Sequence, residues 1–162
     1  KAYVTLSSVF VAEASPSQGV VQVAPLTGQH VTTPFTVGTG GWLTGSPSGG
    51  LEYAYYRFSI VGAAASAANG AVTCSPQCAL PAVDWTNRSS PSYWLSQGGA
   101  LLRPWTARGA VSGLAFPGGG HFTVVRARTA TGATGMAIAR GPIVAPASAS
   151  LSAGDAQAAL WK

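Results

Sequence analysis

Charged side chains are scarce in this chain of 162 residues. They make up 8% of the sequence, whereas soluble domains average about 25%. The hydrophobic fraction of 47% is ordinary for a globular protein. We therefore expect a folded domain whose surface is built mainly from Ser, Thr, Gly, Ala, Gln and Asn.

The sequence has no cluster of basic residues. Its formal net charge of +5 reflects the presence of only four acids, and the nine Lys and Arg residues are scattered. Proteins that bind nucleic acid usually carry a basic stripe or arm. The closest pair, Arg126 and Arg128, is more typical of a solvated strand face. We expect no nucleic-acid partner for this domain.

Long apolar runs are also missing. A membrane-spanning helix needs about 18 or more consecutive apolar residues, and Gly, Ser, Thr or Pro interrupts every candidate run. We therefore expect no membrane insertion. No signal peptide is visible, and the first residue is Lys1 rather than Met. This start predicts that the chain is excised from a longer chain or processed, and it leaves secretion open. Because no internal repeat or charged linker divides the sequence, we expect a single domain, 1–162.

Cysteine is limited to Cys74 and Cys78, in the pattern C-x-x-x-C. Because His30 and His121 are distant in sequence, a zinc site lacks obvious ligands, and we expect no metal. Two interpretations stay open: a disulfide that closes the short loop 75–77, or two free thiols. A disulfide would favour an extracellular or virion-surface location.

Motifs for catalysis are absent from the sequence. The nucleophile-elbow pattern G-x-S-x-G does not occur, and the glycine-rich stretch 37–41 lacks the Lys-Ser/Thr ending of a phosphate-binding loop. Among the four acids, Glu52 and Asp84 are the one pair worth testing for glycoside hydrolysis. We expect no enzymatic activity and no cofactor.

What the chain does contain is a series of short β-prone runs separated by Gly, Pro and Ser. The runs are 2–6, 8–12, 19–24, 31–37, 51–61, 70–74, 99–103, 110–116, 121–128 and 134–144. Helical crossovers have no room between them, so the pattern predicts an all-β, antiparallel β-sandwich, jelly-roll-like, with little helix. We expect a loop or one helical turn at 63–68 and a short helix at 151–161.

The run 51–61 is the most aromatic part of the chain. Strand alternation places one set of side chains on a core face: Ala54, Tyr56, Phe58 and Ile60. The opposite face then carries Tyr53, Tyr55, Arg57 and Ser59. Phenols and a guanidinium combine apolar area with polar tips, so Tyr53, Tyr55 and Arg57 form a candidate subunit interface or sugar-stacking surface. Packing of this face on another strand, or partial cover by a loop, is the alternative.

A second group of aromatic and basic residues follows in a segment rich in turn-forming residues. Its members are Trp85, Arg88, Tyr93, Trp94, Arg103 and Trp105. Large aromatic side chains in such a segment are candidates for a receptor-binding or glycan-binding platform. The alternative is that they close one end of the sandwich.

Two passages resemble coat proteins of small non-enveloped icosahedral RNA viruses. The run 53–61 is similar to an aromatic strand of the type Y-x-x-Y-R-φ-x-φ, where φ is apolar, followed by a small-residue loop and a strand that opens at Gly70. The segment 132–146 is similar to the Gly-led final strand and terminal proline of such domains. Neither a basic packaging arm nor the calcium-binding Asp sets of many such shells has a counterpart here. The resemblance, which covers about a quarter of the chain, therefore points to a protruding (spike) domain.

The resemblance implies a capsid domain on the virion surface. Such a domain would associate with its copies as a dimer or trimer and attach to a host receptor or glycan. The alternative is a secreted or cell-surface carbohydrate-binding module, which would be extracellular and monomeric and would depend on Trp94 or Trp105.

Overall fold

The structure is a computed structural model, and it describes residues 14–45, 50–59, 64–65, 72–73, 91–96 and 98–145. Within these ranges the chain forms short and long strands and one six-residue helix, α1 (Pro91–Ser96). The strands expected at 2–6 and 8–12, the helix expected at 151–161, and both Cys74 and Cys78 lie outside the described residues.

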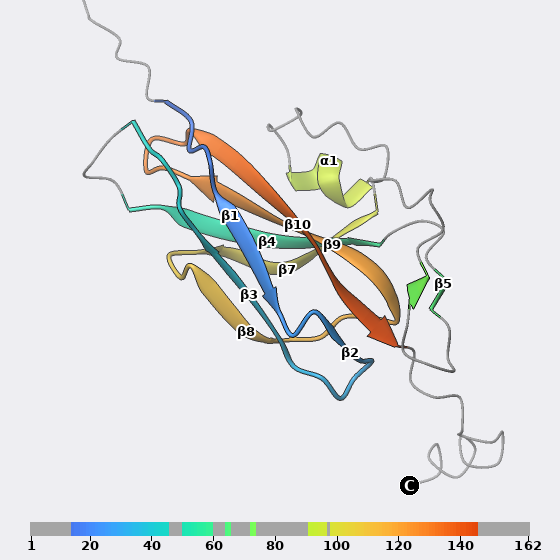
Figure 1. The fold of residues 1–162 in the computed structure, drawn as a ribbon. Coiled ribbons are helices and arrows are strands. Elements are labelled where there is room, and N and C mark those ends of the chain that lie inside the picture. Colours follow the sequence, from blue (N-terminus) through green and yellow to red (C-terminus); the bar gives the residue numbers. More distant parts are fainter. Residues whose placement is uncertain are drawn as a thin grey trace, which may run out of the picture.

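The larger sheet has the strand order β2-β10-β9-β4-β7 (Figure 1). Its strands are β2 (Thr27–Gln29), β4 (Glu52–Ser59), β7 (Gly99–Thr106), β9 (Gly119–Arg128) and β10 (Thr134–Ala145). Neighbours pair antiparallel except for β10 with β2, which is parallel. The strand β4, from the aromatic run, therefore lies near the middle of the sheet.

A three-stranded antiparallel sheet packs on one face of the larger sheet. It has the order β1-β3-β8, with strands β1 (Val20–Ala24), β3 (Phe35–Gly40) and β8 (Ala110–Leu114). In Figure 1, β1 and β3 cross in front of β4 and β9. A further antiparallel pair is formed by β5 (Ala64–Ala65) and β6 (Val72–Thr73).

The core between the two sheets is apolar and contains residues from both. The three-stranded sheet contributes Val21, Val23, Phe35, Val37, Val111 and Leu114, and the larger sheet contributes Tyr55, Val125, Ala137 and Val144. Phe116, just after β8, meets Phe35 edge to face with ring centroids 5.3 Å apart. This shared core confirms the predicted all-β sandwich.

The other face of the larger sheet carries a second apolar cluster. Its buried members are Ala54, Tyr56, Phe58, Phe122, Val124 and, from α1, Trp94. As a result every residue of β9 from 120 to 127 is buried. A strand that is buried on both faces shows no alternation of apolar and polar residues, and β9 indeed includes buried Thr123 and Arg126.

Four elements differ from the sequence-based expectation. Residues 64–65 form a strand rather than a loop or helical turn, α1 occupies part of the segment expected to be turns, and β2 was not expected. The strand expected at 31–37 begins only at Phe35, because Val31 has a positive φ of 70° and a turn links Gln29 to Thr33. Pairing with a neighbour, rather than local pattern, creates these short strands.

Two features are absent from the described residues. None of their helices is long and apolar enough to cross a membrane. None of their side chains forms a group of three or more His, Cys, Asp and Glu residues placed to hold a metal ion.

His121 is a buried titratable residue of β9. Its Nε2 donates a hydrogen bond to the carbonyl of Pro117 (2.8 Å), and its ring packs on Phe116 at a centroid distance of 5.4 Å. Its Nδ1 has no hydrogen-bond partner among the described residues. Burial lowers the pKa of the imidazole, the hydrogen bond to Pro117 opposes this, and the nearby Arg57 charge lowers the pKa further.

We expect acidification from about pH 7.5 to about pH 5.5 to lower the free energy of unfolding by up to about 1.4 kcal/mol. The unfolded chain takes up a proton near the usual histidine pKa of about 6.5, whereas folded His121 has a lower pKa. The stabilisation is therefore complete above the unfolded pKa and is lost as the pH falls below it. Urea unfolding at the two pH values measures the change. His121→Gln, which keeps a donor but does not titrate, should lose less stability, and an equal loss in both proteins would contradict the assignment to His121.

Candidate functional site

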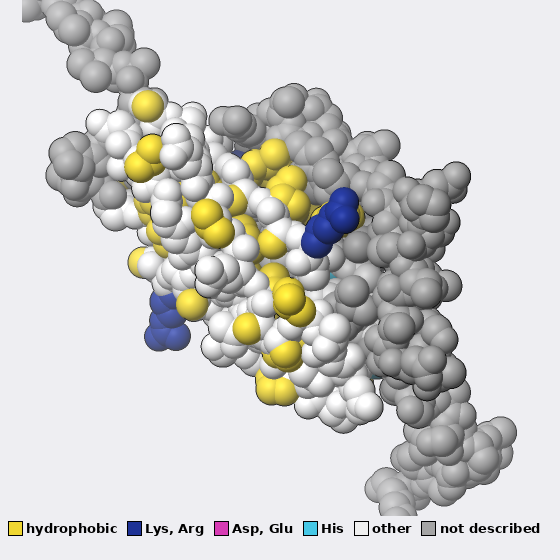
Figure 2. Space-filling model, viewed as in Figure 1, with side chains coloured by type: hydrophobic (Ala, Val, Ile, Leu, Met, Phe, Trp, Pro, Cys, Tyr) yellow, Lys and Arg dark blue, Asp and Glu magenta, His cyan; other side chains and the backbone are white. Residues whose placement is uncertain are grey.

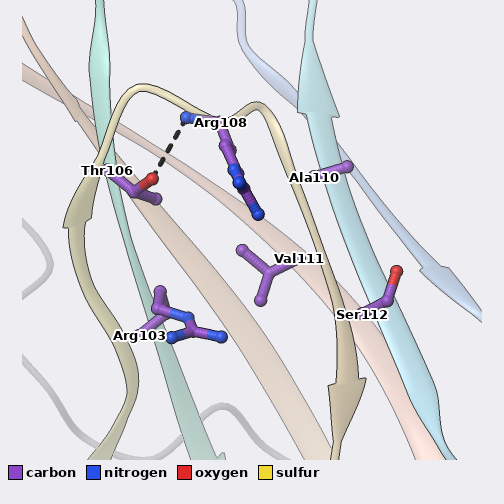
Figure 3. A pocket seen from close by; sticks show the side chains of 6 residues that line it. All are labelled: Arg103, Thr106, Arg108, Ala110, Val111 and Ser112. Atoms are coloured by element: carbon purple, nitrogen blue, oxygen red, sulfur yellow. Dashed lines mark hydrogen bonds between the residues drawn. The ribbon is translucent and has the colours of Figure 1, made fainter.

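A pocket of about 390 Å³ lies between β7 and β8, which are the terminal strands of the two sheets. We call it the β7–β8 groove. It is lined by Arg103, Thr106, Arg108, Ala110, Val111 and Ser112. Figure 3 shows the side chain of Arg108 descending from the turn that joins the strands, with Arg103 on β7 below it and Val111 between them. Two cations and the Thr106 hydroxyl thus lie on the same side of β8 as the largely buried Val111, whereas Ala110 and Ser112 point to the other side.

Hydrogen bonds to main-chain atoms hold the turn that carries Arg108. The Tyr55 hydroxyl donates to the Arg108 carbonyl (2.8 Å), and the Arg108 N–H donates to Oγ1 of Thr106 (3.2 Å). The Thr39 N–H donates to the Gly109 carbonyl (2.7 Å). Because these bonds use the backbone of the turn, the Arg108 side chain is left exposed at the groove.

Arg103 is positioned by its place on a terminal strand. It is paired with Tyr55 in the register of β7 and β4. No further strand of this sheet pairs with β7 beyond that point in the part of the chain that the structure describes, so the Arg103 side chain is exposed and lines the groove. The groove therefore combines one residue of the larger sheet with one residue of the connecting turn.

The groove is electrostatically positive. The one acid in the described ranges is Glu52, and its carboxylate binds Arg128, with Oε2 lying 2.6 Å from Nη2 and 2.7 Å from Nε. Arg128 and Glu52 come from β9 and β4, and neither lines the groove. Arginine stays protonated at neutral pH, and a hydroxyl without a base is a poor nucleophile. The arrangement is thus suited to binding an anion rather than to proton transfer.

Trp94, a predicted receptor-binding or glycan-binding residue, is a core residue. Its exposed fraction is 0%, and its ring lies 5.4 Å from Tyr56 and 6.0 Å from Phe58, centroid to centroid. A sugar cannot reach this ring, so the prediction of a binding role is wrong for Trp94. The burial agrees with the alternative, in which these aromatic residues fill the sandwich.

Trp105 is half-buried and is contacted by arginines of β9. The guanidinium of Arg128 lies 4.3 Å from its ring centroid, and that of Arg126 lies 5.8 Å away. Arg126 also lies 5.3 Å from the ring centroid of Trp94. The aromatic and basic residues of this region are therefore paired with one another inside the domain, and an open platform is not formed by Trp94 and Trp105.

Of the remaining members of the predicted platform, some lie outside the described residues and one lies in the groove. Trp85 and Arg88 lie outside the described residues, and so does the side chain of Tyr93, a residue of α1. Arg103 lies in the β7–β8 groove. None of the described tryptophans lines that groove.

The predicted subunit interface is largely internal. Tyr55 has an exposed fraction of 0% and lies in the core between the sheets, where burial, with a smaller contribution from Tyr53, raises its pKa to about 12. Tyr53 is half-buried, with its ring 6.4 Å from that of Trp42, and Arg57 is half-buried. The interface prediction is wrong for Tyr55, because the three-stranded sheet already covers this face. Tyr55 packs on strands of the three-stranded sheet, as the alternative interpretation predicted.

A second surface feature lies on the side of the three-stranded sheet that faces away from the larger sheet. This side has a hollow of about 560 Å³, which is lined by Val20, Gln22, Gly38, Thr39, Gly40, Gly41, Gly109 and Ala110. All of these residues are uncharged. Figure 2 views the molecule from this side; Lys and Arg side chains appear only toward the margins, and no Asp or Glu is visible among the described residues. We call this surface the outer face.

Comparisons with protein-family models, with curated proteins and with solved structures found no match for this chain. Sequence reasoning had included Arg103 but missed Arg108 and the outer face. The single signal for Arg108 was its position before Gly109, which is typical of a turn but not of a site. The groove and the outer face are therefore the two features of the described residues that bear on function.

Proposed function

We propose that this chain is a structural domain of the virion surface, namely the protruding domain of a coat protein from a small non-enveloped icosahedral RNA virus. In this proposal the outer face pairs with a second copy of the chain, and the β7–β8 groove faces a host receptor. The jelly-roll-like connectivity stays a prediction. The observation that carries the proposal is the uncharged outer face with its exposed strand backbone.

Gly38 and Gly40 are the informative residues of that face. They lie on β3, the central strand of the three-stranded sheet, where glycine weakens a strand and often marks a close approach of another backbone. Neither has a positive φ, a Cβ added at Gly38 would meet its nearest neighbours only at 4.0 Å, and nothing lies within 4 Å at Gly40. The fold does not require these glycines, so we assign them to contact with a partner.

A second copy of the chain suits the outer face. The cores of protein interfaces are depleted in charge, and a two-fold interface places the same surface against itself. A face without charge meets its own copy without repulsion. Gln22, opposite Gly38 in the register of β1 and β3, would then lie within the contact.

We expect Gln22→Lys to weaken self-association by about tenfold or more, because it places like charges against each other across the two-fold axis. Light scattering over a concentration series measures the mass of the wild-type chain and of the variant. Ala130→Lys adds the same charge in an exposed turn between β9 and β10 that does not line the outer face, and it should leave association unchanged.

Two results would contradict this proposal. A wild-type chain that is monomeric at every concentration would remove the association role and favour a monomeric carbohydrate-binding module. An oligomer whose stability is unchanged by Gln22→Lys would show that the contact lies elsewhere.

A further inference from the structure

We propose that the β7–β8 groove binds the acidic group of a small saccharide, with Arg103 and Arg108 contacting its carboxylate or sulfate oxygens. The inference names the ligand class for the attachment part of the proposed function and rests on that part for its biological meaning. Binding in the groove and association through the outer face are measured separately, so either one can fail alone.

The two arginines of the groove lack the partners that the neighbouring arginines have. Arg126 stacks on two tryptophan rings, and Arg128 pairs with Glu52 and stacks on Trp105. In the described part of the chain, neither Arg103 nor Arg108 has an ion pair or a side-chain hydrogen bond. Two guanidinium groups in one groove repel each other, and an anion bound between them removes that cost.

The shape and lining of the groove favour a small polar ligand. A guanidinium presents a planar fork of donors that matches the oxygens of a carboxylate or sulfate. The Thr106 hydroxyl lines the groove and accepts the Arg108 N–H, and it can still donate a hydrogen bond to a polar group of a ligand. A volume of about 390 Å³ lies in the range of small-molecule sites.

The distribution of charge argues against a long polyanion. Nucleic acids bind along rows of basic residues. Outside the groove, the one cation classed as exposed in the described ranges is Arg140, on β10, which two strands, β9 and β4, separate from β7. Two adjacent arginines without a basic track fit one acidic group rather than a phosphate backbone.

The groove is also held in shape before any ligand binds. The turn that carries Arg108 is fixed through its backbone by Tyr55, Thr106 and Thr39. Binding therefore has to order the two arginine side chains but not the turn itself, which reduces the entropic cost of association.

The test is an NMR titration of the isotope-labelled chain with three probes: glucuronate, glucose and inorganic sulfate. We expect glucuronate to shift the amide signals of residues 106–112 saturably, glucose to leave them unchanged, and sulfate to bind more weakly than glucuronate. Arg103→Gln and Arg108→Gln should each weaken glucuronate binding by about tenfold. Arg140→Gln removes an exposed arginine elsewhere and should leave binding unchanged.

Four outcomes would overturn the proposal. The first is the absence of saturable shifts with glucuronate, and the second is equal binding of glucose. The third is binding that survives both groove substitutions. The fourth is binding of sulfate as tight as that of glucuronate, since it would show that no sugar is recognised. None of these results bears on self-association, which light scattering measures through Gln22→Lys.

Discussion

Replacing Tyr55 by alanine is expected to lower the free energy of unfolding by about 3–5 kcal/mol. The side chain is fully buried between the two sheets. Its removal leaves a cavity that the strands on either side can fill only in part, and it deprives the Arg108 carbonyl of its hydrogen-bond donor. Urea unfolding followed by circular dichroism measures the loss.

Two further variants separate the contributions of Tyr55. Tyr55→Phe keeps the ring and removes the hydroxyl, so it should cost only about 1 kcal/mol. Tyr53→Ala removes a half-buried phenol from the same strand and should cost less than Tyr55→Ala. If Tyr55→Ala proved as stable as the wild type while weakening self-association, Tyr55 would belong to an interface and its place in the core would be refuted.

Trp94→Ala should destabilise the domain by a similar amount, about 3–5 kcal/mol. Its ring fills the second apolar cluster, in contact with Tyr56 and Phe58, and it also stacks with Arg126. Truncation exposes these residues and leaves the Arg126 charge with one aromatic partner fewer. Thermal unfolding followed by near-ultraviolet circular dichroism reports both the stability and the packing of the remaining aromatic side chains.

The adjacent residue of α1 provides the control for Trp94. Leu95 is 45% exposed, so Leu95→Ala should change the free energy of unfolding by less than about 1 kcal/mol. Comparable losses for the two variants would mean that each substitution acts through the helical stability of α1. The insertion of Trp94 into the cluster would then not be the source of the stability.

Strand alternation predicted much of the fold but not its burial. In β4 it separated Ala54, Tyr56 and Phe58 correctly from Tyr53 and Tyr55. It could not reveal that both sets are covered, because alternation distinguishes two faces of a strand without identifying what packs on each. One face is covered by the three-stranded sheet, whose strands come from both sides of β4 in sequence.

The candidate site was predictable only in part. Arg103 stood out because it lies near several tryptophans in the sequence. Arg108 did not, because a single arginine between Ala107 and Gly109 carries no motif. The groove exists because β7 and β8 belong to different sheets and are joined by a short turn, a relation that depends on the order of strands in both sheets. The order of strands in a sheet cannot be predicted from a short stretch of sequence.

The hydrogen bonds of the β7–β8 turn involve the backbone of Arg108 and leave its side chain unused. The fold uses the carbonyl and the N–H of Arg108, which every amino acid except proline supplies equally. The guanidinium groups at 103 and 108 are therefore open to mutation at little cost in stability. A change of ligand preference in this groove would require only one or two codon changes, while the buried phenol of Tyr55 would keep the turn in the same conformation.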